Sequence, residues 1–180
     1  MRGSVLLFCI AFVTGAASAS VSFNSADCDI VVAPDASKIV RYSADELSEF
    51  LSKTLGGKIP VCTQITQGRK SIILGTNGWS KAAGLAPEKL PRDGYCIKTS
   101  GDCVYVAGCD DPTVDIALMI KADSSVEKNH YFERGTYFGV IEFLERFAGV
   151  RFYFPGELGT IIQPKDGIVV PDTDMTDHPD

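Results

Sequence analysis

The chain has 180 residues, of which 45% are hydrophobic and 22% charged, and its formal net charge is −6. This length suffices for one domain with a hydrophobic core, but it is shorter than the roughly 250 residues of a typical (β/α)8 barrel. The composition is that of a globular protein and excludes collagen-like, coiled-coil and disordered chains. The acidic charge disfavours nucleic acid and anionic membranes, so we expect no nucleic-acid and no membrane partner.

The first 19 residues have the three parts of a secretory signal peptide. Arg2 gives a positive start, residues 5–13 form an apolar run, and residues 17–19 (Ala-Ser-Ala) match a small-residue cleavage site. The apolar run is shorter than the roughly 20 residues that a membrane-spanning helix needs. We therefore expect a mature chain that starts at Ser20 and is secreted or periplasmic. An uncleaved anchor is the alternative.

Five cysteines remain after such a cleavage, an odd number that leaves at least one thiol unpaired. An oxidising compartment permits disulfides. The sequence contains no Cys-x-x-Cys pair of the kind that binds zinc or exchanges disulfides. At most two bridges can form, and we expect mainly small buried side chains with one bridge. The five residues, whose pairing the sequence leaves open, are Cys28, Cys62, Cys96, Cys103 and Cys109.

The first half of the domain alternates short strands with one long helix. Residues 29–33 form a β-branched run that predicts a strand. Apolar residues spaced by four and three predict an amphipathic helix over residues 37–55, and the two glycines that follow predict its end. Residues 61–66 and 71–76 predict two more strands. A connection with at most one helical turn follows, over residues 76–87.

The clearest hairpin signal joins residues 95–99 to residues 103–107, with a turn at residues 100–101. In this register Ile97 faces Val104. Because side chains alternate along a strand, the side that carries these two residues is expected to face the core.

The second half contains another amphipathic pattern, over residues 136–148, which predicts a second long helix that ends at Gly149. A short helix is expected at residues 114–121 and a polar loop at residues 123–130. Three short strands are expected at residues 150–154, 160–163 and 168–170. Residues 171–180 are expected to form a polar tail without regular structure. Together the elements predict an α+β fold. We expect a two-layer α/β sandwich whose mixed, mostly antiparallel sheet carries two main helices on one face.

The sequence lacks the motifs of the common enzyme classes. Its two histidines, His130 and His178, lie in segments without predicted regular structure, and neither belongs to a His-Glu-x-x-His zinc motif. There is no Gly-x-Ser-x-Gly nucleophile elbow, no P-loop and no dinucleotide-binding glycine motif. We therefore expect no catalytic residue, no cofactor and no metal site in this chain.

Carboxylates and aromatic rings are the remaining candidates, because glycosidases need two acids and an aromatic ring can stack on a sugar. Glu142 and Glu145 are expected to lie on a solvated helix face, and the tail aspartates to form a solvated linker rather than a calcium loop. Trp79, Tyr131 and Glu157 are candidate ligand contacts. Each also has a structural interpretation, which is packing for the two aromatic residues and backbone capping for the glutamate.

Several blocks of sequence carry a further pattern, at residues 45–51, 56–60, 72–76, 93–95, 106–108, 134–140 and 143–159. The most specific is Arg-Gly-Thr-Tyr-Phe-Gly-Val at residues 134–140, which continues to Gly-Val-Arg-Phe-Tyr and Pro-Gly-Glu-Leu-Gly. Together these blocks resemble the N-terminal domain of α-glucuronidases, and related domains precede the catalytic barrel of β-hexosaminidases. The resemblance covers residues 29–170. Residues 110–133 make the connection between the Val-Ala-Gly block and the Arg-Gly-Thr block longer than is usual in this family.

The resemblance implies an accessory α/β domain without catalytic residues, because the catalytic carboxylates of this family lie in the barrel that follows. Gly135 and Gly139 are four residues apart on one helix face and would let the helix approach the sheet closely. The motif residues for which we expect a structural role are Gly135, Gly139, Gly149, Arg151, Pro155 and Gly156.

We therefore expect residues 20–170 to be the non-catalytic N-terminal accessory domain of a secreted glycoside hydrolase. Residues 1–19 would be its signal peptide and residues 171–180 a linker or tail. Its partner would be a C-terminal catalytic barrel absent from this chain, with carbohydrate as a second partner class. The alternatives are a free-standing carbohydrate-binding or protein-interaction module and an independent hydrolase. An exposed apolar face would favour the accessory domain, and an aromatic groove around Trp79 or Tyr131 the module.

Overall fold

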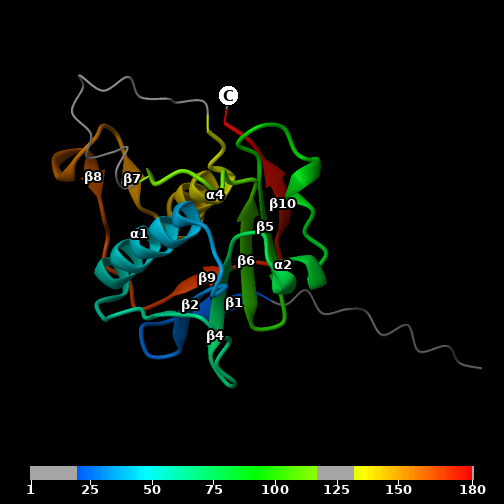
Figure 1. The fold of residues 1–180 in the computed structure, drawn as a ribbon. Coiled ribbons are helices and arrows are strands. Elements are labelled where there is room, and N and C mark those ends of the chain that lie inside the picture. The colour runs from blue at the N-terminus through cyan, green and yellow to red at the C-terminus, as the bar shows by residue number, and fades with distance from the viewer. Residues whose placement is uncertain (1–19, 117–131, 180) are drawn as a thin grey trace, which may run out of the picture.

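The computed structural model describes residues 20–116 and 132–179, which contain a six-stranded sheet of order β10-β5-β6-β4-β2-β3 (Figure 1). The strands of this sheet are β2 (Cys28–Val32), β3 (Val61–Cys62), β4 (Lys70–Leu74), β5 (Tyr95–Ser100), β6 (Cys103–Gly108) and β10 (Asp174–Asp177). Two small sheets pair β1 (Val21–Phe23) with β9 (Ile168–Val170) and β7 (Arg151–Phe152) with β8 (Thr160–Ile161).

The main sheet is mixed. Strands β2, β3, β4 and β6 run parallel, whereas β5 is antiparallel to β6 and β10 is antiparallel to β5. When the two small sheets are included, antiparallel pairings outnumber parallel ones among the described strands. The predicted α+β class is therefore confirmed. The four parallel strands bring their carboxyl ends to one edge of the sheet, which is where the candidate site lies.

The first long helix, α1 (Lys38–Leu55), begins and ends as its sequence predicts. Ser37 caps its N-terminus, because the Ser37 hydroxyl accepts a hydrogen bond from the backbone N–H of Val40 at 3.3 Å. Gly56 adopts the left-handed conformation that ends the helix, with φ of 66°. The apolar stripe of the helix faces the sheet.

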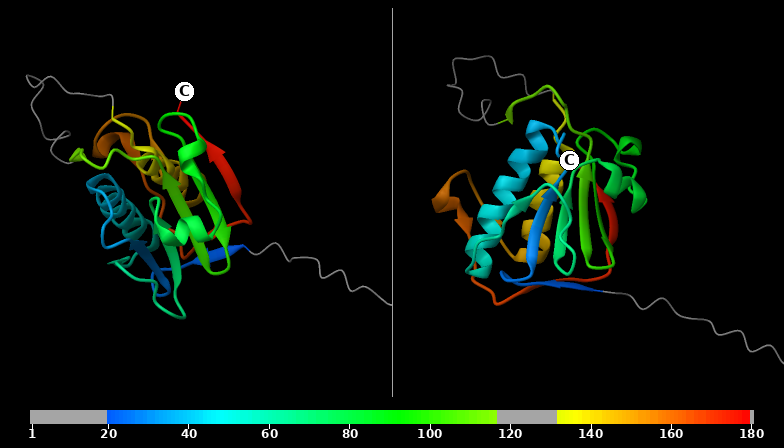
Figure 2. Two further views of the ribbon diagram at one scale, coloured as in Figure 1. Left: turned by 45° about the vertical axis from the view of Figure 1, so that its right-hand side comes forward. Right: turned by 60° about the horizontal axis from the view of Figure 1, so that its bottom comes forward.

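The second long helix, α4 (Gly135–Phe143), continues into a wider π-helical turn, η2 (Leu144–Ala148). Gly149 ends it in the left-handed conformation, with φ of 76°. The helix position is as predicted, whereas the change to π geometry was not. Helices α1 and α4 contact each other on one face of the main sheet, as Figure 2 shows.

The hydrophobic core lies between these two helices and the sheet. Its largest fully buried side chains include Phe23, Ile30, Leu47, Leu51, Ile72, Leu74, Ile97, Phe143 and Leu144. The opposite face of the sheet is partly covered by a connection that contains α2 (Gly78–Ala82) and η1 (Pro87–Lys89), where Leu85 packs on Cys96 and Ala107. The described residues therefore have a core of their own.

The β5–β6 hairpin has a different register from the predicted one. Its turn is formed by Gly101 and Asp102, and Ile97 lies opposite Val106 rather than Val104. A two-residue hairpin turn needs a left-handed first residue, and Gly101, with φ of 58°, provides it. The shift is two residues, and side chains alternate with a period of two, so the prediction of the core-facing side is confirmed.

The polar tail contains a strand, so the expectation of a tail without regular structure is wrong for residues 174–177. This strand, β10, pairs with β5 and places Met175 against the core. Its start is fixed by Thr173, whose carbonyl oxygen accepts a hydrogen bond from the backbone N–H of Thr99 at 2.8 Å and whose N–H donates to the Thr99 hydroxyl at 2.8 Å. An edge strand with one exposed face can be rich in Asp and Thr, which is why its sequence resembles a linker.

Other expectations differ in extent or lie outside the described residues. The strands expected at residues 61–66, 150–154 and 160–163 are two residues long each. The five cysteines of the described region are all free. No helix in residues 20–116 and 132–179 is long and apolar enough to cross a membrane. The proposed signal peptide, most of the helix expected at residues 114–121 and the loop at residues 123–130 lie outside the described residues.

Replacing Gly135 by alanine should destabilise the fold. A methyl group at this position would overlap the backbone carbonyl oxygen of Gly94, which cannot move aside as a flexible side chain can. We expect a loss of about 1–3 kcal/mol in the free energy of unfolding, measured by urea denaturation with circular dichroism. The matched control is Gly78→Ala in α2, where no atom lies within 4 Å of the added carbon. Equal stability of the two variants would contradict the close contact.

Candidate functional site: a cleft at the carboxyl edge of the sheet

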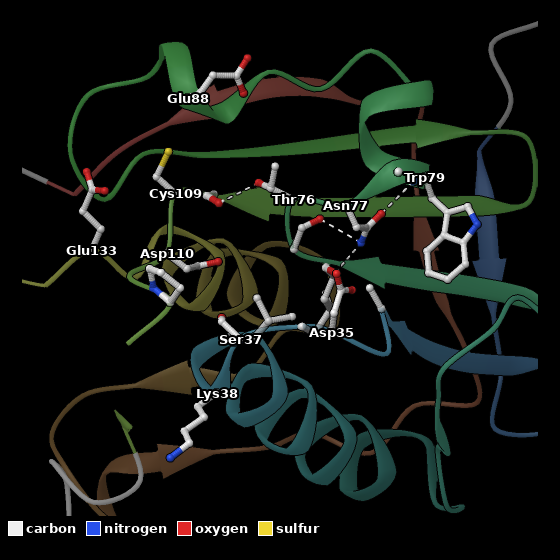
Figure 3. A pocket seen from close by; sticks show the side chains of 18 residues that line it. Asp35, Ser37, Lys38, Thr76, Asn77, Trp79, Glu88, Cys109, Asp110 and Glu133 are labelled. Carbon is white, nitrogen blue, oxygen red and sulfur yellow. Dashed lines mark hydrogen bonds between the residues drawn. The ribbon is translucent and has the colours of Figure 1, made fainter. Parts of the chain in front are cut away.

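A cavity of about 850 Å³ lies where the parallel strands β2, β4 and β6 end (Figure 3). The carboxyl ends of parallel strands are the usual ligand-binding edge of open α/β sheets. The cavity is lined by residues that follow these strands and by the start of α1 and α2. Its polar lining residues are Asp35, Ser37, Lys38, Thr76, Asn77, Glu88, Cys109, Asp110 and Glu133.

Asn77 is fully engaged in local structure. Its side-chain oxygen accepts hydrogen bonds from the backbone N–H groups of Trp79 (2.9 Å) and Ser80 (3.1 Å), which caps α2. Its side-chain nitrogen donates to the carbonyl oxygens of Leu74 (3.0 Å) and Gly75 (3.2 Å), as the dashed lines in Figure 3 indicate. The amide therefore fixes the turn between β4 and α2 and has little capacity left for a ligand.

Asp110 fixes the start of α4. Its carboxylate accepts hydrogen bonds from the backbone N–H of Thr136 at 3.0 Å and from the hydroxyl of the same threonine. A second carboxylate, Asp93, accepts from the backbone N–H of Arg134 at 2.8 Å. Two acids thus satisfy free N–H groups at the positive end of the helix. Burial raises the pKa of Asp110 to about 6, although its hydrogen bonds to Thr136 oppose the shift.

The cleft is acidic. Asp35, Glu88, Asp110 and Glu133 line it, and the ammonium of Lys38 lies 2.9 Å from the carboxylate of Asp115, at the surface. Burial raises the pKa of the Cys109 thiol, and the nearby carboxylates raise it further, so this thiol is protonated and not a nucleophile at neutral pH. In the described part of the chain, no group of three or more residues could hold a metal ion. An acidic cleft of this kind repels anions.

The sequence-predicted contact residues do not meet in one site. Trp79 is half-buried at one end of the cleft, opposite Glu133 in Figure 3, and no other aromatic residue lines the described cleft. Glu157 is exposed and lines a different groove, between the β7–β8 hairpin and the two long helices. Tyr131 and His130 lie outside the described residues. His178 is exposed at the end of β10.

The motif residues form contacts within the backbone scaffold. A carbon added at Gly139 would lie 2.7 Å from Val106 and 3.1 Å from Tyr95, so this glycine lets α4 lie directly on β5 and β6. Arg151 donates hydrogen bonds to the carbonyl oxygens of Glu145 (2.6 Å) and Val150 (2.9 Å), which joins η2 to β7. Pro155 and Gly156 are exposed in the hairpin turn, and Gly156 has φ of 94°.

Sequence reasoning missed the two capping aspartates. Asp110 is 26 residues from the threonine that it binds, and Asp93 is 41 residues from the arginine that it binds. Sequence signatures of helix caps rest on residues within about one turn of the helix start. No local pattern could therefore have indicated these two contacts.

The raised pKa of Asp110 predicts a pH-dependent stability. Between pH 3.8, its ordinary pKa, and about pH 6, this group binds more protons in the folded chain than in the unfolded one. The contribution of Asp110 to the free energy of unfolding is therefore fully present below pH 3.8 and is lost as the pH rises to about 6. Relative to wild type, the Asp110→Asn variant should therefore gain up to about 3 kcal/mol of unfolding free energy between pH 4 and pH 7, measured by urea denaturation.

The control is Asp111→Asn, since hydrogen bonds from Thr113 lower the pKa of this neighbouring exposed aspartate. It should not reproduce the gain. If Asp110→Asn and wild type have the same pH dependence, the capping carboxylate is not desolvated as the structure indicates.

Comparison with known proteins identifies the family of the chain. Residues 16–114, more than half of the sequence, match the family model described as the N-terminus of glycosyl hydrolase family 67. No significant match to a curated protein was found. The GH20 β-N-acetylhexosaminidase from Streptomyces coelicolor A3(2) has a similar fold, with a TM-score of 0.54 and 15% identity over 90% of this chain and 24% of that chain.

Two further solved structures are similar at lower TM-scores. A family GH115 4-O-methyl-α-glucuronidase with specificity for decorated arabinogalactans gives a TM-score of 0.47 and 19% identity, over 87% of this chain and 18% of that chain. A GH20 exo-β-N-acetylglucosaminidase from Vibrio harveyi gives 0.47 and 13%, over 91% and 17%. The chain thus spans less than a quarter of each of these enzymes. By its family match, the chain belongs to the glycosyl hydrolase family 67 N-terminal domains, the N-terminal domain of α-glucuronidases.

Proposed function

We propose that this chain is the non-catalytic accessory domain of a secreted glycoside hydrolase of the α-glucuronidase type, which supports a catalytic domain in the degradation of polysaccharides or glycosides. The family match is the observation that carries this proposal, because the family is defined as the N-terminal part of glycosyl hydrolases. The similar fold in a β-N-acetylhexosaminidase, of which it spans 24%, agrees with an accessory role beside a larger catalytic part.

The chemistry of the cleft supports a role without catalysis. The side chains of Asn77 and Asp110 are held by hydrogen bonds to backbone or neighbouring groups, so they are not placed to act on a substrate. A glucuronic acid residue carries a carboxylate, and a cleft with four acidic side chains would repel it. The accessory role also agrees with the contacts of Asp110, whose carboxylate stabilises the start of α4.

The signal-peptide pattern of residues 1–19 supports secretion. A positive N-terminus, a short apolar run and a small-residue cleavage site are the features that direct a chain to export. Polysaccharides are extracellular substrates, so an exported enzyme is consistent with the proposed role.

The proposal is tested by assaying two proteins. The reading frame that continues past the codon for Asp180 should encode a catalytic domain, and the protein made from the whole frame should hydrolyse aryl glucuronides or other aryl glycosides. Residues 20–180 should give no turnover above the buffer control. Turnover by residues 20–180 that is lost in Glu133→Gln or Asp35→Asn would overturn the non-catalytic role. A stop codon directly after Asp180 would overturn the accessory role.

A further inference from the structure

The hairpin of β7 and β8 holds four large apolar side chains in solvent. The exposed fraction is 69% for Tyr153, 57% for Phe154, 93% for Leu158 and 47% for Ile161. Single exposed apolar residues are normal on protein surfaces, but a cluster within one hairpin marks an interaction site. We call these four residues the hairpin surface.

The hairpin surface borders an apolar groove of about 720 Å³. The groove lies between the hairpin and the outer sides of α1 and α4. It contains the rings of Phe50 and Phe152, which pack edge to face with centroids 5.2 Å apart. Tyr137 and Ile141 of α4 complete the wall on the other side. Tyr153 and Phe154 of the hairpin surface also line the groove, so the groove and this part of the hairpin surface adjoin.

The hairpin is held in this exposed position by its backbone. The N–H of Tyr153 donates to the carbonyl oxygen of Gly159 at 2.8 Å, and Gly159 has no space for a side chain beside Phe154. The Thr160 hydroxyl donates to the carbonyl oxygen of Gly156 at 3.1 Å. The apolar side chains therefore project from an ordered turn, although burying them would be favourable in water.

The rim of the groove is acidic. Glu46, Glu49 and Glu157 lie along it with one cation, Lys53, which is paired with Glu49 at 2.6 Å. A partner surface that fits this region presents apolar side chains flanked by Arg or Lys, because electrostatic complementarity governs such contacts.

The acidic rim also discriminates between occupants. Two copies of this chain joined by a two-fold axis would bring two acidic rims together. Anionic lipid would be repelled in the same way. A sugar could use the ring faces of Tyr153 and Phe154, but Leu158 and Ile161 have neither a ring nor a hydrogen-bonding group for it, and Leu158 projects almost fully into solvent. A protein with a basic and apolar surface is the occupant that agrees with all these features.

We propose that the hairpin surface and its groove are the docking site for the catalytic domain of the same enzyme. This inference rests on the proposed function, which supplies the partner. Docking would bury the four apolar side chains and place basic groups of the catalytic domain against Glu46 and Glu157. The cleft near Trp79 lies outside this interface.

Hydrogen exchange by mass spectrometry tests the docking site. Amides of residues 151–162 should exchange at least about tenfold more slowly in the protein made from the whole reading frame than in residues 20–180. Amides of β9, where Val169 is 62% exposed, should exchange equally in both. Equal exchange of residues 151–162 in a full-length enzyme that hydrolyses glycosides would overturn the docking site and leave the proposed function intact.

Variants of the full-length enzyme give an independent readout. Leu158→Ser removes a side chain with few contacts in the domain, so the domain should still fold, whereas the protection of residues 151–162 should fall at least about threefold. Glu157→Lys should have the same effect through charge repulsion. Val169→Ser is the matched control and should change nothing. Protection unaffected by both hairpin variants would also contradict the docking site.

Two more outcomes are decisive. A dimer of residues 20–180 in light scattering that Leu158→Ser converts to a monomer would assign the surface to a second copy and overturn the inference. A full-length product without glycosidase activity on any aryl glycoside would overturn the proposed function, and the docking site with it.

Discussion

The fold depends on a close contact between α4 and the sheet that leaves no room for side chains. A carbon added at Gly108 would overlap the backbone of Gly135, and one added at Gly139 would lie 2.7 Å from Val106. Three glycines thus allow the helix backbone to rest on β5 and β6. Because packed interiors tolerate little added volume, this contact determines the depth of α4 and, through η2, the position of the β7–β8 hairpin.

The same contact explains the cleft. It brings the N-terminus of α4 to the carboxyl edge of the sheet, where α1 and α2 also begin. Three helix starts at one edge need hydrogen-bond acceptors, and Ser37, Asn77 and Asp110 supply them. These three polar side chains, which make the cavity resemble an active site, therefore serve backbone groups. The exposed apolar side chains lie elsewhere, on the hairpin surface and in the groove along the outer sides of α1 and α4.

Much of the local structure was predictable, because it depends on neighbouring residues. The spacing of apolar residues gave the extent of α1, and the glycines at positions 56 and 149 gave the ends of both long helices. Alternation gave the buried side of the β5–β6 hairpin, whereas its register depended on which residue pair could adopt the turn. The strand β10 was missed, because an edge strand exposed on one side has the composition of a linker.

The sequence by itself determined the fold class, the family and the absence of the usual catalytic motifs, since these depend on composition, periodicity and short motifs. Only the tertiary structure decided which polar residues are in use, because Asp93 and Asp110 cap a helix that begins far along the chain. It also decided that Trp79 and Glu157 lie in different places. Exposure of the hairpin surface is likewise a tertiary property, because burial depends on what the rest of the chain leaves uncovered.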